Sequence, residues 1–339
     1  MKKVLSIIFA LAMIFSLMPT SLAVDLTGND TMKTVEEAGY SFRISERIDE
    51  YGRITRSIKS EDYESRQTHS EFTENMEKTK AMLAAVGMQK ENIDRLDDET
   101  LQSFAVSREI TVMTSYSKVD SSGNVTYLPE EQAAAESAEL NSAQDAIKYK
   151  YAVEGAATLS TTEKKYFQDS YMRVDLTVSY QGNAQYLYAV DSEWLTMPTF
   201  RGTDSLGACA MNNTVSPDTQ YGYYIYDITY INYGNAVNGN WYGSACYFNL
   251  PNDTFGLSSS TLYSNFRVHF QYRSHYTSPN TGGWFNAVGN YTHARIAVSP
   301  SISVGIDTKA GTLSVAIGLE LHGLKDIRGA EVEMHHIPG

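Results

Sequence analysis

A series of short alternating segments in the second half of the chain restricts the fold more than any other feature. In MRVDLTVSY and AQYLYAV apolar residues alternate with polar ones, and the turn QGN joins the two segments. Similar runs follow at 221–233, 241–250, 262–276, 291–299, 301–306 and 312–321. Short, regularly spaced strands joined by Gly, Asn and Pro turns are typical of an antiparallel sandwich or barrel. We therefore predict an all-β antiparallel sandwich over residues 165–339, with a barrel as the alternative.

Residues 24–128 show the mixed pattern of a small α+β domain. Alternation on both sides of DEYG predicts a hairpin. A helical period from Phe72 to Val86, followed by Gly87, predicts a helix with a glycine cap. Asp97 is a suitable N-cap for a second short helix, and REITVMTSYSKVD and VTYL predict two further strands. The Ala/Glu-rich stretch 129–164 has no apolar stripe, so we interpret it as a spacer, with an exposed helix as the alternative.

Residues 1–23 have the organisation of a secretory signal peptide. Two lysines precede an apolar run at 4–17, and the tripeptide SLA, which ends at Ala23, fits signal peptidase. The run is shorter than the roughly 20 apolar residues that a spanning helix needs, and no later stretch reaches that length. We predict cleavage after Ala23 and a secreted, extracellular protein without a stable membrane span.

The charge of the chain limits its partners. The formal net charge is −13, and removal of residues 1–23 takes away two lysines and no acidic residue, which gives −15. A strongly acidic protein is repelled by phosphate backbones and by anionic membranes. We therefore expect no nucleic acid as a partner.

The two cysteines, Cys209 and Cys246, predict a disulfide. An exported chain meets oxidising surroundings, and an even cysteine number there suggests a bridge. In the chain-entropy model such a bridge would stabilise the fold by roughly 3–4 kcal/mol. Two buried thiols are the alternative.

Two nucleophile arrangements fail on simple grounds. The string GTDSLG resembles a serine-hydrolase motif, but it is one residue too long for Gly-x-Ser-x-Gly and no helix follows it. A thiolate at Cys209, with His269 or His293 as its base, would need a thiol of lowered pKa. The predicted disulfide explains the same cysteine with fewer assumptions. We therefore predict no catalytic residue.

The C-terminal histidines could in principle bind a divalent metal. His335 and His336 are adjacent, however, so on a strand they would point to opposite faces. His322 lies nearby, but neither HExxH nor a Cys/His zinc spacing is present. We interpret them as exposed tail residues and predict no metal site and no cofactor.

Two other functions remain as alternatives. The hairpin SISVGIDTKAGTLSVAIGLEL approaches the strand length of about 9–11 residues that spans a bilayer, which would suit a pore-forming or membrane-active protein. One apolar face packed on a sandwich core gives the same pattern. A carboxylate-dependent hydrolase is the other alternative, because the separation of two carboxylates is a property of the fold.

Aromatic residues are the remaining functional candidates. Fifteen of the 24 tyrosines lie between residues 180 and 291. Tyr and Trp are enriched at interfaces, and aromatic faces can stack on sugar rings. Tyr224 and Tyr226 share one face of an alternating strand. With Trp241 and Trp284 they form our predicted binding residues, for a glycan or another protein.

Three strings carry a resemblance to other proteins. WLTMPTFRGTDSLGACAM, NWYGSACYFNLPND and NVTYLPEE resemble uncharacterised secreted proteins of Gram-positive bacteria. The resemblance implies export and a shared fold over most of the mature chain. It implies no site residue, because that group has no established activity. The sequence thus favours a non-catalytic extracellular protein that binds or interacts at the cell envelope.

Overall fold

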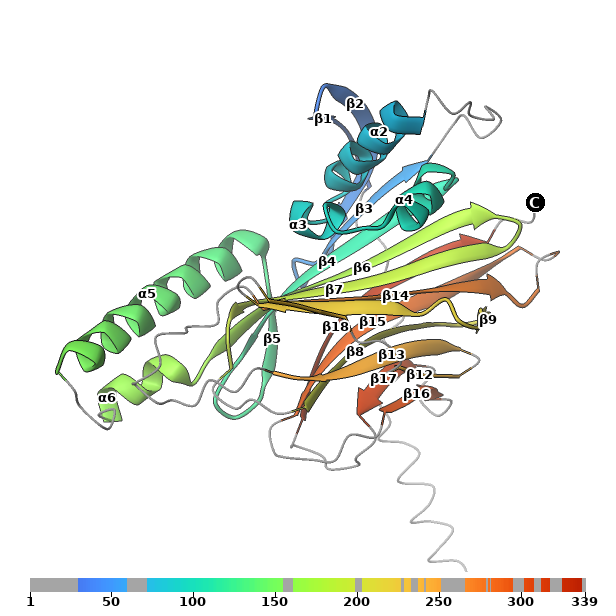
Figure 1. Ribbon diagram of the computed structural model, residues 1–339. Coiled ribbons are helices and arrows are strands. Elements are labelled where there is room, and N and C mark those ends of the chain that lie inside the picture. Colours follow the sequence, from blue (N-terminus) through green and yellow to red (C-terminus); the bar gives the residue numbers. More distant parts are fainter. Residues whose placement is uncertain are drawn as a thin grey trace, which may run out of the picture.

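One large antiparallel sheet runs through both halves of the chain (Figure 1). The computed structural model describes residues 30–59, 72–154, 161–198, 203–226, 229–232, 237–240, 242–250, 266–278, 280, 282–294, 302–307, 312–317 and 325–336. The sheet has the order β1-β2-β3-β4-β6-β7-β14-β10-β11, with β5 beside β4 and β9 beside β14. Its strands are β1 (Thr31–Glu37), β2 (Tyr40–Ile48), β3 (Ile54–Lys59), β4 (Glu109–Val119), β5 (Val125–Leu128), β6 (Ser170–Gly182), β7 (Gln185–Thr196), β9 (Asn213–Val215), β10 (Tyr221–Tyr226), β11 (Thr229–Asn232) and β14 (Arg267–Tyr276).

A second sheet of five strands packs against one face of the large sheet. Its order is β12-β13-β8-β15-β18. The strands are β12 (Val237–Asn240), β13 (Gly243–Asn249), β8 (Thr203–Ala210), β15 (Gly283–Ala294) and β18 (Lys325–His336). Both strand orders begin and end at different strands, so within the described residues the sheets are open and the barrel alternative is not found. The prediction of mostly antiparallel β structure is confirmed.

The core between the two sheets is apolar and rich in aromatic rings. Leu176, Val190 and Phe270 of the large sheet are almost fully buried, as are Leu206 and Ala208 of the second sheet. This layer accounts for the apolar half of each alternating segment, since successive residues of a strand face opposite sides.

The sheets approach each other closely at Gly289 on β15. A Cβ atom built there would lie 3.0 Å from Val190 Cγ2 and 3.2 Å from Leu176 Cβ. Four residues away on β15, Phe285 meets Tyr186 of β7 edge to face, at 5.3 Å between ring centroids. A glycine at 289 therefore allows the close approach of β15 to β6 and β7, and aromatic rings fill the space between the sheets further along the strand.

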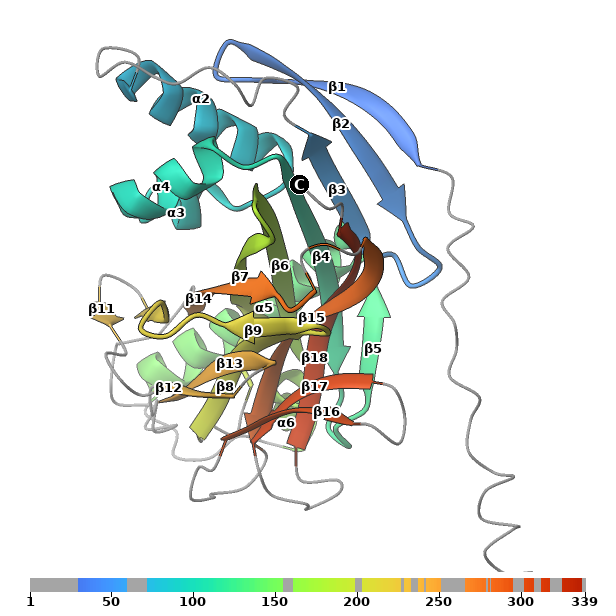
Figure 2. The same cartoon turned by 90° about the vertical axis from the view of Figure 1, so that its right-hand side faces the viewer.

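Three helices cover the other face of the large sheet. They are α2 (Phe72–Ala85), α3 (Lys90–Ile93) and α4 (Asp98–Ala105), and they lie on the opposite side of β6 and β7 from the second sheet (Figure 2). Gly87 follows α2 with a left-handed φ of +100°, and Met88 N donates to Leu83 O at 3.0 Å. The Asp97 side chain accepts a hydrogen bond from Thr100 N at 2.7 Å. Both predicted helix caps are confirmed.

Residues 130–154 form a long helix, α5 (Glu130–Glu154). The sequence favoured a spacer here, with an exposed helix as the alternative, and the structure contains the helix. Its buried side consists of small and polar side chains, including Ala133, Ser137 and Gln144. Gln144 Nε2 donates to Tyr166 O at 2.8 Å, and Asn141 Nδ2 donates to Leu195 O at 2.7 Å. Ala133 and Leu140 also pack against Tyr116, Leu128 and Tyr171. The helix therefore docks through a few small apolar contacts and hydrogen bonds, which explains why the sequence shows no broad apolar stripe. Two short helical turns follow, α6 (Thr161–Lys164) and η1 (Lys165–Phe167).

Strand β4 joins the two predicted domains within one sheet. It pairs with β3 on one edge and with β6 on the other, so Ile110 lies between Ile58 and Ser179. Both of its faces are covered: Val112 packs in the core beneath the helices, and Ser115 Oγ donates to Gly329 O at 2.9 Å. The predicted division between 24–128 and 165–339 thus falls inside a continuous sheet.

The predicted disulfide is absent, and the strand register explains why. Cys209 lies opposite Gly243, whereas Cys246 lies opposite Leu206, three residues away on the same strand. Opposed residues share a face and residues three apart do not, so the two sulfurs point to opposite sides of the sheet. Three residues of strand also separate them by about 10 Å, beyond the Cα separation that a disulfide can bridge. Both cysteines are buried thiols.

The C-terminal segment is also different from its prediction. Residues 325–336 form β18, which pairs with β15 along its whole length, so His335 and His336 belong to a strand and not to an exposed tail. The last predicted hairpin is present as β16 (Ile302–Asp307) and β17 (Thr312–Ile317). Insertion of this hairpin into a membrane stays a prediction. The predicted signal peptide at 1–23 and the predicted binding residue Trp241 lie outside the described residues.

Candidate functional site

The predicted aromatic residues occupy two separate places. Tyr224 and Tyr226 share one face of β10, and their rings stack with 6.2 Å between centroids. Tyr224 also contacts Phe248 and Phe266, at 6.0 and 5.8 Å. This face looks toward the second sheet, so both tyrosines are half-buried against the core. Their role in binding stays a prediction.

Trp284 lies at the opposite end of the two packed sheets. On β14, Val268 is opposite Tyr224, whereas Tyr276 contacts Phe285, the residue after Trp284. The eight-residue separation between positions 268 and 276 corresponds to roughly 26 Å of strand. Trp284 is 65% exposed, the third-highest fraction among the exposed large apolar residues of the described chain. The four predicted binding residues therefore do not form one patch.

The surroundings of Trp284 form what we call the loop end: residues 182–185, 211–213, 242, 276–277 and 284. The β6–β7 turn and the β14–β15 connection meet there (Figure 1). Tyr276 N donates to Ala184 O and Thr277 N to Asn212 O, both at 2.8 Å. Ala210 N donates to the carbonyl of Tyr242, whose side chain is 43% exposed. These bonds tie neighbouring connections to one another.

Local sequence dictates the turns at the loop end. Asn183 and Asn212 adopt left-handed φ values of 50° and 57°, which asparagine tolerates better than most residues. Ala184 takes φ 61°, a conformation that costs an alanine of order 1 kcal/mol or more. The hydrogen bond that the Ala184 carbonyl accepts from Tyr276 N holds the residue in this conformation. A surface fixed in this way loses little entropy when it binds a ligand.

The serine-hydrolase arrangement is not formed. Asp204 and His293 meet on the inner face of the second sheet, with His293 Nδ1 3.0 Å from Asp204 Oδ1. Tyr291 Oη also donates to Asp204, and Trp194 Nε1 donates to Tyr291 Oη at 3.0 Å. Ser205 follows Asp204 on the strand and so faces the other side of the sheet. The Asp204 cluster is buried and fixes the two sheets to each other.

The thiolate arrangement fails for a similar reason. Cys209 lies on the outer face of the second sheet, because Ala208 and Ala210 on either side of it face the core. His293 lies on the inner face of that sheet. His269 lies on the far face of the large sheet, next to Tyr223 and Asp191. Neither histidine can therefore act as a base for Cys209 in this fold.

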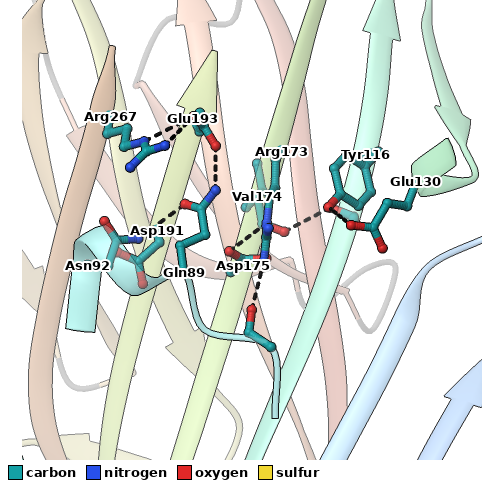
Figure 3. Close-up of polar contacts among 12 residues, drawn as sticks. Gln89, Asn92, Tyr116, Glu130, Arg173, Val174, Asp175, Asp191, Glu193 and Arg267 are labelled. Atoms are coloured by element: carbon teal, nitrogen blue, oxygen red, sulfur yellow. Dashed lines mark hydrogen bonds and ion pairs between the residues drawn. The ribbon is translucent and has the colours of Figure 1, made fainter. Parts of the chain in front are cut away.

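A layer of charged and amide side chains is buried between the large sheet and helices α3 and α4 (Figure 3). We call it the polar layer, and it consists of Arg173, Asp175, Asp191, Glu193, Arg267, His269 and Gln271 from the strands, with Gln89, Asn92 and Thr100 from the helical side. Neighbouring strands place opposite charges side by side: Arg173 is opposite Glu193, and Glu193 is opposite Arg267.

Arg173 is the central cation of the polar layer. Its Nε lies 3.0 and 2.9 Å from the two carboxylate oxygens of Asp175, and its Nη2 donates to Gly87 O at 2.7 Å (Figure 3). Burial raises the pKa of Asp175; Arg173 opposes this rise, and the nearby Asp191 adds to it. Arg173 thus links the end of α2 to β6 and compensates the buried Asp175 carboxylate.

Contacts from the strands hold α3 and α4 in the same way. Gln89 donates to Glu193, which also accepts from Arg267 Nη2 at 2.7 Å. Gln271 Nε2 donates to Thr100 Oγ1 at 2.8 Å. A buried charge is tolerated only when it is paired and hydrogen-bonded. The polar layer satisfies this for most of its members and fixes the helices in register on the sheet.

His269 is the titratable group of the polar layer nearest to neutral pH. Its Nδ1 lies 2.8 Å from Asp191 Oδ1 and its Nε2 lies 3.0 Å from Gln271 Oε1. Burial acts to lower the pKa of His269, but the Asp191 carboxylate outweighs it, and the pKa is raised above the ordinary 6.5. An imidazolium satisfies both oxygens, because each ring nitrogen then donates.

This raised pKa predicts a pH dependence of stability. The folded protein binds the His269 proton more tightly than the unfolded chain, so the stabilisation is full below about pH 6.5 and is lost as the pH rises through the folded-state pKa. Urea unfolding of wild type should therefore show a falling free energy above pH 6.5, and His269→Gln should flatten that slope. An equal slope in both proteins would contradict the assignment.

The described residues contain no cluster of three or more His, Cys, Asp or Glu side chains that could hold a metal ion. Nor does any described helix combine the length and apolarity needed to cross a bilayer.

Comparison with known proteins gives no family. No protein-family model and no curated protein matches the chain. Two solved structures show local likeness: the pilus backbone RrgB from Streptococcus pneumoniae, with TM-score 0.23 and 10% identity over 46% of this chain and 40% of that one, and the collagen-binding domain of Erysipelothrix rhusiopathiae surface protein RspB, with TM-score 0.21 and 3% identity over 49% and 66%. The chain covers less than two thirds of either. Both TM-scores are too low to support an inference about this protein.

Sequence reasoning missed the polar layer. The polar residues that alternate in MRVDLTVSY, VDSEW and RVHFQYR suggest a solvent-facing side. Those segments become neighbouring strands, and they place opposite charges side by side: Arg173 next to Glu193, and Asp191 next to His269. Such pairs can be recognised only once the strand order and register are known, and they do not by themselves indicate burial.

Proposed function

We propose that the protein is a non-catalytic extracellular binding protein of the cell envelope, and that it binds through the loop end. The observation that carries this proposal is Trp284, a large aromatic side chain that is 65% exposed beside hydrogen-bonded turns. An exposed tryptophan on a rigid strand presents much contact area at low entropic cost. Loops at one end of a sandwich are a common place for binding residues.

A neutral glycan of the cell wall is the ligand class that this surface fits best. Sugar rings can stack on an indole or phenol face, and Trp284 and Tyr242 both expose one at this end of the second sheet. The acidic balance of the chain, −13 in total, disfavours strongly acidic partners. The failure of both nucleophile arrangements supports a binding role without catalysis.

Retention on purified cell-wall material tests the proposal. Wild type should be retained, and Trp284→Ala should lose at least about tenfold in affinity, because aromatic hot spots commonly contribute more than about 1.4 kcal/mol. Its melting temperature should stay close to wild type, since the side chain is mostly exposed. The matched control, Val106→Ala, removes a half-exposed apolar side chain elsewhere and should bind normally.

Two outcomes would contradict the proposal. Wild type that is retained on no cell-wall or glycan material would remove its basis. Retention that is equal in wild type and Trp284→Ala would place binding elsewhere on the surface, with the half-buried Tyr224 and Tyr226 as the next residues to replace.

A further inference from the structure

Helix α5 has a second face that the body of the protein does not use. Ala133, Ser137 and Gln144 face the sheets, and the opposite side of the helix carries exposed residues at regular spacing. These residues, which we call the α5 seam, are Ala135, Glu139, Ser142, Ala146, Tyr149 and Val153. Their separations of 4, 3, 4, 3 and 4 residues are those of a coiled-coil seam.

The largest side chains of the seam are strongly exposed. Tyr149 is 74% and Val153 is 67% accessible, which makes them the two most exposed large apolar residues of the described chain. They lie one turn apart at the far end of α5, which extends away from the sheets (Figure 1). The 25-residue helix is about 37 Å long, so a second molecule can approach its outer face.

We propose that the α5 seam is an interface between two copies of this chain, with their α5 helices paired antiparallel about a two-fold axis near residue 144. A two-fold interface is self-complementary, so each residue of one helix meets the residue at a mirrored position of the other. With the axis there, Val153 meets Ala135, and Tyr149 packs next to Ser142. The large side chains of one copy thus fill the space left by small side chains of the other.

One pair of charges on α5 is complementary in the same arrangement. The first half of the helix exposes Glu131 and Glu139, and its second half carries Lys148 and Lys150 alongside two acidic residues. Antiparallel pairing brings Glu139 of one copy beside Lys150 of the other, on the same flank of the seam, twice per dimer. Lys150 remains 52% exposed although its Nζ lies 3.1 Å from Glu163 Oε1. A parallel pairing would instead oppose like charges.

Asp145 lies close to the proposed axis, so it would approach Asp145 of the other copy. Lys148 Nζ is 3.5 Å from Asp145 Oδ1 within the same helix and compensates the charge of this carboxylate. The interface consists of one helix from each copy, which places it at the small end of specific interfaces. We expect a reversible dimer whose population rises with protein concentration.

Sedimentation of the mature chain with two charge reversals tests the interface. Glu139→Lys and Lys150→Glu should each raise the dimer dissociation constant at least about tenfold, because each creates two like-charge contacts. An equimolar mixture of the two variants should dimerise again, since both Glu–Lys contacts are restored across the mixed pair. Tyr149→Ala should weaken the wild-type dimer without the mixing effect.

Glu131→Lys is the matched control. It makes the same charge change on the same helix, but its mirrored position lies beyond the end of the partner's α5, so it should dimerise like wild type. Three results would overturn the proposal: a wild type that is monomeric at every concentration reached, a mixture that stays monomeric, or a control that fails to dimerise. The test needs no ligand, so it stands or falls independently of glycan binding.

Discussion

Replacement of Arg173 by methionine is expected to lower the free energy of unfolding by about 3–5 kcal/mol. Methionine keeps much of the aliphatic volume, but it removes the cation 2.9 Å from the Asp175 carboxylate, which is 2% exposed. It also removes the donor to Gly87 O. Urea denaturation measured at pH 8 gives the loss most directly.

The effect of Arg173→Met should depend on pH in a defined direction. Burial already raises the pKa of Asp175, and loss of Arg173 raises it further, so the carboxyl can protonate in the folded variant. The destabilisation should therefore be smaller at pH 5 than at pH 8. The double variant Arg173→Met with Asp175→Asn removes both charges and should recover part of the stability. A single variant as stable as wild type would contradict the role given to the polar layer.

Separation of the chain at the predicted domain boundary is expected to abolish cooperative folding of both parts. A fragment of residues 24–128 keeps β4 but loses β6, and a fragment of residues 165–339 loses β4 from the edge of β6. Nearly every residue of β4 is buried in the whole chain, so its face toward β18 would become exposed. Each fragment would also carry half of the polar layer without its partners.

Denaturant titrations of the two fragments and of residues 24–339 measure this loss. The long chain should unfold in a cooperative transition, and the fragments should show broad, non-cooperative changes with poorly dispersed amide spectra. A cooperative transition in the fragment of residues 24–128 would mean that its helices and hairpin form an independent domain. The continuous sheet would then be a docking contact between two folded units.

Local sequence signals predicted most of the strands and the helix caps, because those signals act over a few residues. Asp97 and Gly87 serve as caps through bonds to residues three to five positions away. The alternation of Val174, Leu176 and Val178 correctly indicates the core face. Period and capping chemistry are readable without knowledge of the fold.

Features that depend on strand register could not be predicted in this way. Whether Cys209 faces Cys246 depends on a shift of three residues between β8 and β13, which no local pattern specifies. The same holds for the burial of Asp175 and Asp191, whose cover comes from helices encoded about 70 to 100 residues earlier. Trp284 was predicted as a binding residue from its residue type alone. Only the fold shows that it lies far from Tyr224, with which it was grouped.

Helix α5 shows a further limit of pattern reading. The helix lacks a broad apolar stripe because Asn141 and Gln144 dock it through hydrogen bonds to β7 and to η1, and among its described residues only Ala133 and Leu140 add apolar contacts to the sheet. The apolar residues Tyr149 and Val153 lie on the opposite, exposed face. The regular spacing was present in the sequence, but it belongs to a face that the folded chain leaves open.

Binding at the loop end has a direct spectroscopic test. Trp194 is 3% exposed and Trp284 is 65% exposed, so acrylamide should quench Trp284 far more strongly, and the difference between wild type and Trp284→Phe isolates its emission. Addition of soluble cell-wall glycan should protect that emission from quenching. Quenching of Trp284 that stays the same at a glycan concentration sufficient for retention would contradict binding through the loop end.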